Sequence, residues 1–214
     1  MCFSISLSKS KKQLENSSEA SFRNDEKYQP KQFVSAFTKP LVPIITDKEP
    51  NTIRLFNWGL IPHWVKSEEM AKNIATKTFN AISETVHQKP SFRDAFRSQR
   101  CVVLADGFYE WRTDGKIKTP YHIFLEDHKT FAFAGIYNTW VNRDTGEVND
   151  TFSILTQESN PFMSKIHNLK KRQPILIHST KLWLEKGNFN TILTQSFHTD
   201  FKAVKLDKNF RKTI

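Results

Sequence analysis

Short runs of apolar residues, many of them alternating with polar ones, recur along this chain and predict strands more often than helices. In residues 3–7 (FSISL) every second side chain is apolar, and residues 100–105 (RCVVLA) form the continuous apolar run of a buried strand. The stretch 33–45 is interrupted by two prolines, which favours an edge strand or an ordered loop. Further strands are expected at 53–60, 108–112, 121–126, 131–137, 152–156, 174–177 and 201–206, with a hairpin turn at 113–115.

Helices are expected where a capping residue precedes a suitable segment. Ser67 and Ser91 are placed to cap helices over 67–72 and 92–99. Asn160, followed by Pro161, predicts a helix over 160–171. A short helix within 8–31 and a helix over 180–186, ended by Gly187, complete the prediction.

These elements predict the α+β class, with mainly antiparallel β-sheets forming an open barrel-like core and several short helices. The length of 214 residues fits one domain. We expect that domain to cover 1–195, with a C-terminal strand and basic tail, 196–214, packed on it.

Charge adds a functional indication. The chain has 32 Lys and Arg against 22 Asp and Glu, a formal net charge of +10. Such an excess favours a polyanionic partner through phosphate contacts, although a basic surface kept for solubility explains it equally well. The 18 Phe and 5 Trp residues can fill a core or stack on bases.

The two cysteines, Cys2 and Cys101, are too few for a disulfide framework or a cysteine zinc site, and we expect no metal or cofactor. No apolar run is long enough to span a membrane, and the start of the chain does not resemble a secretory signal. The expectation is therefore a monomeric protein of the reducing cytoplasm, associated with the nucleoid when bound to DNA. Cys101, inside RCVVLA, is expected to be a core residue.

Cys2 carries a distinctive potential chemistry. If Met1 is removed, Cys2 has a free α-amine beside its thiol, and both groups ionise near neutral pH. The amine can condense with an aldehyde to an imine, and the thiol can then close a thiazolidine ring. Taken alone, however, a cysteine after the initiator is more simply explained as incidental.

Four segments give Cys2 a context: FNWGLIPHW (56–64), FNAISET (79–85), KPSFRDAFRSQRCVVLADGFYEWR (89–112) and FSILTQESNPFMSKIHNLKKRQP (152–174). Together with the Met-Cys start, they resemble the SOS response-associated peptidase (SRAP) family, whose members crosslink to abasic sites. The resemblance extends from Met1 to about Ile177, with the motifs in the same order.

The resemblance implies a catalytic set made of Cys2, Asn80, Glu110 and His167. Cys2 falls on the family nucleophile, and Asn80 is expected to position the abasic sugar or the amine. Glu110 is expected to shuttle protons during imine formation and reversal, and His167 to assist opening of the deoxyribose ring. Without the resemblance, each has an ordinary alternative: Glu110 exposed or lining a pocket, His167 solvated on a helix, Asn80 in a turn.

The resemblance also indicates a DNA-binding surface. The densest basic cluster lies next to His167, and its alternative explanation is a solvated helix end. The aromatic candidates are expected to flank bases, although tryptophans of this kind are often core residues. The predicted DNA-binding residues are Phe37, Trp58, Trp111, Thr156, Lys170, Lys171 and Arg172, with Trp64 as a weaker candidate.

The chain departs from the family pattern at two arginines. Ser4 stands where an arginine near the nucleophile is usual, and Ile82 replaces the arginine of the Asn-Ala-Arg motif. Inserted Lys170 and Lys171 can restore charge but not the bidentate geometry of a guanidinium.

The expected function is an abasic-site sensor in single-stranded DNA that forms a reversible thiazolidine crosslink through Cys2. A cysteine peptidase or autopeptidase and a non-covalent single-stranded nucleic-acid binder remain alternatives.

Overall fold

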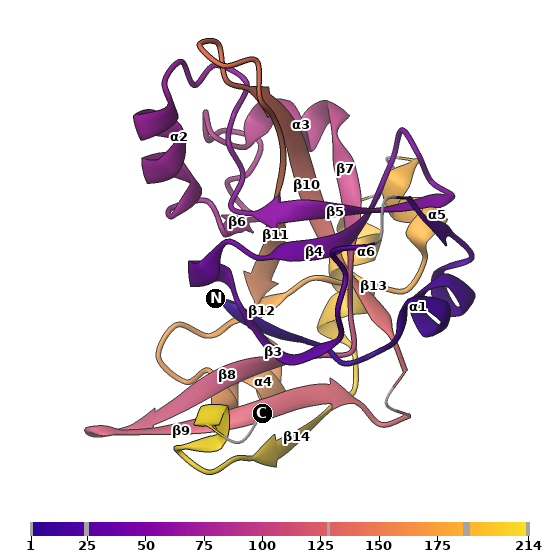
Figure 1. Cartoon of the computed structure of the whole chain (residues 1–214). Helices are drawn as coiled ribbons and strands as arrows, with labels where there is room; N and C mark the ends of the chain where they lie inside the picture. Colours follow the sequence, from indigo (N-terminus) through magenta and orange to yellow (C-terminus); the bar gives the residue numbers. More distant parts are fainter. Residues whose placement is uncertain (1, 24–25, 128, 186–188, 213–214) are drawn as a thin grey trace.

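The fold is built around a closed ring of five strands in the computed structural model, which describes residues 2–23, 26–127, 129–185 and 189–212 (Figure 1). Antiparallel pairing connects β5 (Thr52–Trp58), β4 (Leu41–Thr46), β7 (Arg100–Ala105), β10 (Phe131–Val141) and β11 (Val148–Glu158) in that order. Parallel pairing of β11 with β5, at Phe152 and Trp58, closes the ring. The α+β prediction is confirmed, but the barrel is closed where an open one was expected.

A second, antiparallel sheet lies against the barrel. Its order is β14 (Phe201–Lys205), β9 (Ile117–Leu125), β8 (Gly107–Asp114), β1 (Ser4–Leu7) and β3 (Lys31–Ser35). In β1, Ile5 pairs with Val34 on one side and Phe108 on the other. The N-terminal strand therefore lies directly beside β8, the strand that carries Glu110. Cys2 and Ile5 join barrel residues such as Phe133 in one buried cluster.

Short elements cover and connect the two sheets (Figure 1). The helices are α1 (Lys11–Ser18), α2 (Glu68–Ala75), α3 (Arg93–Ser98), α4 (Pro161–Ile166), α5 (Thr180–Leu184) and α6 (Phe189–Phe197), with 3-10 turns η1 (Ala36–Thr38) and η2 (Phe210–Lys212). The short strands are β2 (Ser21–Phe22), β6 (Asn80–Ile82), β12 (Arg172–Pro174) and β13 (Leu176–Ile177). Within the described ranges, no helix is long and apolar enough to cross a membrane.

Capping explains which helix boundaries were predicted. The Ser67 side chain accepts a hydrogen bond from the Met70 amide, and Asn160 accepts one from the Met163 amide, as expected. The cap at Ser91 is wrong, because α3 starts after Phe92, which makes no side-chain capping bond. The predicted stop at Gly187 lies outside the described residues.

Two further expectations are corrected. The stretch 33–45 is not one element: 33–35 belong to β3, an edge strand of the second sheet, and 36–38 form η1. The β4 part is not an edge strand, because β4 lies between β5 and β7; its pairing with β7 begins at Ile44, one residue after Pro43. The helix expected over 160–171 is shorter, since α4 ends at Ile166 and His167 is its C-cap. His167 is therefore fixed at a chain turn and does not project from a helix surface.

Candidate active site

The backbone of Cys2 is held in place by Asn80. Cys2 has no exposed surface, and its carbonyl accepts a hydrogen bond of 2.8 Å from the Asn80 Nδ2. Asn80 lies on β6, which pairs in parallel with β11 at Ile154. The barrel thus positions the amide that holds the start of the chain.

Glu110 is a buried carboxyl on β8, and its side chain is only 5% exposed. Burial disfavours the charged form and raises the pKa of Glu110 from 4.5 to about 7. Near neutral pH this carboxyl can therefore both give and accept a proton. The strand pattern left Glu110 either exposed to solvent or lining a pocket. In the structure it is buried and lines a cleft.

His167 faces Glu110 from the end of α4. Its Nδ1 lies 2.9 Å from the carbonyl oxygen of Arg172, so in the neutral ring Nδ1 carries the hydrogen and Nε2 is the acceptor nitrogen. His167 Nε2 is 3.9 Å from a Glu110 carboxyl oxygen. Burial lowers the pKa of His167 to about 4, against the opposing effect of the Arg172 bond. Near pH 7 the imidazole is neutral, so this contact is not an ion pair.

The Cys2 thiol shares this environment. Burial, and next the nearby Glu110 carboxylate, raise the pKa of the thiol well above its ordinary range. The thiol is therefore protonated at neutral pH and needs a base before it can act as a nucleophile. Glu110, whose charge acts on the thiol, and His167, which faces Glu110, are able to accept that proton.

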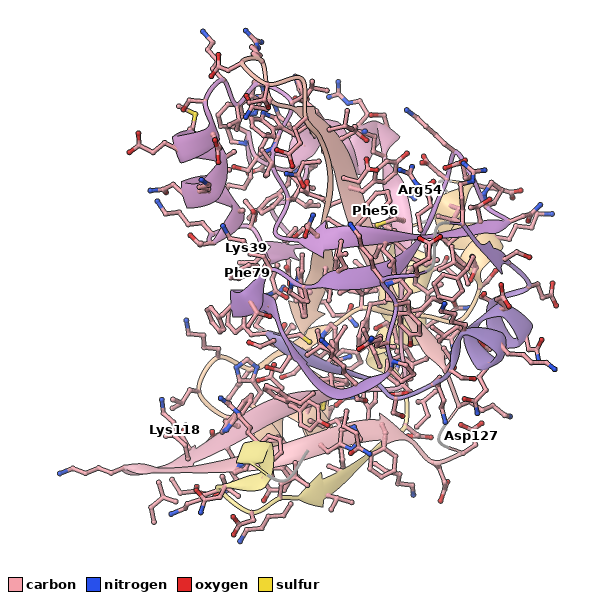
Figure 2. All side chains as sticks on the ribbon, viewed as in Figure 1. Lys39, Arg54, Phe56, Phe79, Lys118 and Asp127 are labelled. Atoms are coloured by element: carbon pink, nitrogen blue, oxygen red, sulfur yellow. The ribbon has the colours of Figure 1, made fainter. Side chains whose placement is uncertain are left out.

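Two clefts open beside these residues, separated by Phe3. The Glu110 cleft has a volume of about 410 Å³, and the Asn80 cleft one of about 420 Å³. Figure 2 labels one lining residue of each, Lys118 on the β8–β9 hairpin and Phe79 beside the barrel. The Glu110 cleft is lined by Phe3, Ser4, Ser35, Phe37, Glu110, Trp111, Thr113, Lys118, His167, Leu169, Lys170 and Arg211.

Three of the predicted DNA-binding residues lie at the Glu110 cleft. Phe37 is 69% exposed and packs against Phe3 and Phe79, with ring centroids 5.3 and 5.5 Å away. Trp111 and Lys170 line the same cleft. Lys171 is exposed and has a left-handed backbone conformation at the turn after His167. Contacts of these residues with DNA remain predictions.

Two other predicted DNA contacts are corrected by burial. Trp58 has no exposed surface, and its indole N–H donates to the Phe79 carbonyl at 2.9 Å, so it is a core residue that cannot stack on a base. Thr156 is equally buried, and its backbone carbonyl accepts a hydrogen bond from Arg172. A fully buried threonine cannot touch a phosphate directly.

Arg172 is already engaged within the protein. Its guanidinium forms a bidentate pair with Glu84, at 2.7 and 2.9 Å, and its side chain is only 16% exposed. Because the Arg172 carbonyl contacts His167, this pair fixes the position of the imidazole. Sequence reasoning missed Glu84, although it is the acidic residue of FNAISET. It also missed Arg211, which lies beyond the segments that carried the resemblance.

Comparison with known proteins places this arrangement in a family. The model for SOS response associated peptidase (SRAP) matches residues 1–211. The chain belongs to the SRAP family. It is 38% identical over 179 residues to YoaM of Bacillus subtilis, named an abasic site processing protein; the match covers 82% of this chain and 75% of that one.

A more distant relative and a solved structure also match this chain. HMCES of Xenopus tropicalis, also named an abasic site processing protein, is 29% identical over 166 residues; these cover 68% of this chain but only 48% of that protein. A crystal structure of a Bacteroides thetaiotaomicron protein superposes with a TM-score of 0.90 at 34% identity, covering 99% of this chain and 94% of that chain.

The two departures from the SRAP pattern lie at the clefts. Ser4 lines the Glu110 cleft, and Ile82, 40% exposed, lines the Asn80 cleft. Neither supplies the positive charge expected there. The cations bordering the clefts come from elsewhere in the chain: Lys77, Lys89, Lys118, Lys170 and Arg211.

Proposed function

We propose that this protein binds single-stranded DNA at an abasic site and bonds covalently to the open-chain sugar through Cys2, once Met1 has been removed. The observation that carries the proposal is the position of Cys2, held by Asn80 and close to the Glu110–His167 pair. The names of the relatives YoaM and HMCES, both abasic site processing proteins, support this substrate. Because these side chains belong to one chain, the reaction needs no second copy.

The first step is opening of the sugar, which exists mainly as a cyclic hemiacetal. A base removes the proton of the C1 hydroxyl, and an acid protonates the ring oxygen, giving an aldehyde and a free hydroxyl. Neutral His167, with its lone pair on Nε2, is suited to be the base. Glu110, whose pKa lies near 7, is suited to be the acid.

The second step joins protein and DNA. The Cys2 amine attacks the aldehyde carbon, a C–N bond forms, and water leaves to give an imine. The thiol sulfur then adds to the imine carbon while its proton passes to the imine nitrogen. A neutral five-membered thiazolidine results with no change in oxidation state. Reversal through Glu110 would release the protein.

The test uses a single-stranded oligonucleotide whose uracil has been excised by uracil-DNA glycosylase. We expect a wild-type adduct that survives SDS. Cys2→Ser retains the amine but not the thiol, so its adduct should require borohydride trapping. Cys101→Ala, which removes the other buried cysteine, is the matched control and should react as wild type. Absence of a wild-type adduct after verified Met1 removal, or an equal SDS-stable yield with Cys2→Ser, refutes the thiazolidine mechanism.

A further inference from the structure

The C-terminal segment folds back onto the wall of the Glu110 cleft. After β14, the 3-10 turn η2 places Phe210 against the second sheet, where it is 8% exposed. The Phe210 ring stacks on Tyr109, with centroids 5.5 Å apart and planes at 18°, and meets Phe33 edge-on at 5.6 Å. Phe210 therefore anchors the residue that follows it.

That residue is Arg211, whose guanidinium is held by aromatic rings. Its Cζ lies 4.9 Å from the ring centroid of Phe33 and 4.9 Å from that of Trp111. Cation–π contacts of this kind orient a guanidinium without using its N–H donors. The side chain is exposed, so these donors can reach a ligand in the cleft.

Among the described residues, Arg211 has no acidic partner, unlike the three arginines that follow. Arg54, Arg112 and Arg172 pair with Asp150, Asp114 and Glu84 respectively. Across the part of the chain that the structure describes, no carboxylate lies within ion-pair distance of Arg211. Arg211 lines the same cleft as Glu110 and His167, and no described carboxylate balances its charge there.

We propose that Arg211 is a phosphate-binding residue, through which the C-terminal segment contributes to DNA binding in the Glu110 cleft. The proposal rests on the proposed function, because it requires single-stranded DNA in that cleft. A pre-oriented guanidinium can bind a phosphate through two parallel hydrogen bonds, which a lysine cannot. Arg211 thereby restores the type of group that is missing at Ser4, a residue of the same cleft.

The experiment measures equilibrium binding of an undamaged single-stranded oligonucleotide by fluorescence anisotropy between 50 and 200 mM salt. For single strands, each phosphate contact contributes about 0.7 to the slope of log K against log salt. Arg211→Ala should reduce that slope by about 0.7. The affinity ratio of wild type to variant should then fall about 2.6-fold across this salt range.

Two matched variants distinguish a phosphate contact made by Arg211 from the general effect of removing one positive charge. Arg143→Ala removes the same charge from the β10–β11 turn, at the opposite end of the molecule from β14 (Figure 1), and should leave the slope unchanged. Arg211→Lys should retain the slope but bind more weakly, because one ammonium releases the counterion without the bidentate geometry. Thermal unfolding of each variant identifies any loss of the fold itself.

Equal slopes for Arg211→Ala and Arg143→Ala overturn the proposal. The same preparations are incubated with the abasic oligonucleotide, so the two proposals are judged separately. An SDS-stable wild-type adduct combined with an unchanged Arg211→Ala slope refutes only the role of Arg211. Absence of the adduct with a reduced slope refutes the covalent function and leaves Arg211 as a phosphate contact.

Discussion

Replacing Glu110 with Gln should stabilise the protein at alkaline pH. Burial raises the pKa of Glu110 from 4.5 to about 7 in the folded state, whereas the unfolded chain retains the ordinary value. A group whose folded pKa is raised contributes stability below its unfolded pKa and loses it as pH rises through the folded pKa. Glutamine is uncharged throughout and avoids this loss.

The size of this stability difference follows from the unfolded and folded pKa values of Glu110. The interval from 4.5 to about 7 corresponds to about 3 kcal/mol, at about 1.36 kcal/mol per pH unit. Because Glu110 is only 4% exposed, solvent screening does not reduce this figure substantially. The free energy of unfolding of Glu110→Gln minus that of wild type should therefore be near zero below pH 4.5. It should rise between pH 4.5 and 7 and level off near pH 8.

Urea titrations at a series of pH values measure this difference directly. His167, whose pKa is lowered to about 4, destabilises the fold as pH falls from 6.5 to 4, but it does so in both proteins and largely cancels. Glu158→Gln changes an exposed carboxyl at the end of β11 and is the control; its effect on stability should not vary with pH in this way. A Glu110→Gln difference that is constant from pH 4 to 9 would show that the carboxyl does not titrate near 7.

Two aromatic replacements test which rings face DNA. Phe37→Ala should weaken single-stranded DNA binding by about 1–3 kcal/mol in an anisotropy titration, because Phe37 is 69% exposed and can stack on a base; unchanged affinity excludes that role. Trp58→Phe should instead lower the free energy of unfolding by about 0.5–1.5 kcal/mol in urea, because the buried Phe79 carbonyl loses its indole donor but keeps the hydrogen bond from the Ile154 amide. Its salt dependence of DNA binding should match wild type, and weaker binding at full stability would contradict the core assignment.

Local sequence signals predicted those helix starts that a single capping residue determines. Ser67 and Asn160 mark helix starts because a side-chain oxygen satisfies a backbone N–H within the next turn. The extent of α4 was not predictable in this way. Asn168 exchanges two hydrogen bonds with the Thr113 backbone, at 2.8 and 3.0 Å, and this tertiary contact is absent from any local pattern. Closure of the barrel, through β5 and β11, likewise joins segments almost a hundred residues apart in sequence.

For the candidate site too, the sequence predicted some features and could not predict others. Motif order selected Cys2, Asn80, Glu110 and His167, and their catalytic roles stay predictions. Burial was the quantity that motifs could not supply. It removes Trp58 and Thr156 from the surface. Side-chain contacts distinguish Arg172, which pairs with Glu84, from Arg211, which has no carboxylate within ion-pair distance among the described residues.

The direction of the pKa shifts bears on the choice between the proposed crosslinking and a cysteine peptidase. A peptidase of the thiolate–imidazolium type needs a lowered thiol pKa and a raised histidine pKa. Burial here moves both groups the other way, and it also favours the protonated form of Glu110. A buried site that favours the neutral forms of its groups is poorly suited to a resting ion pair. It suits a condensation in which amine, aldehyde, thiol and thiazolidine are all uncharged and protons move only over short distances.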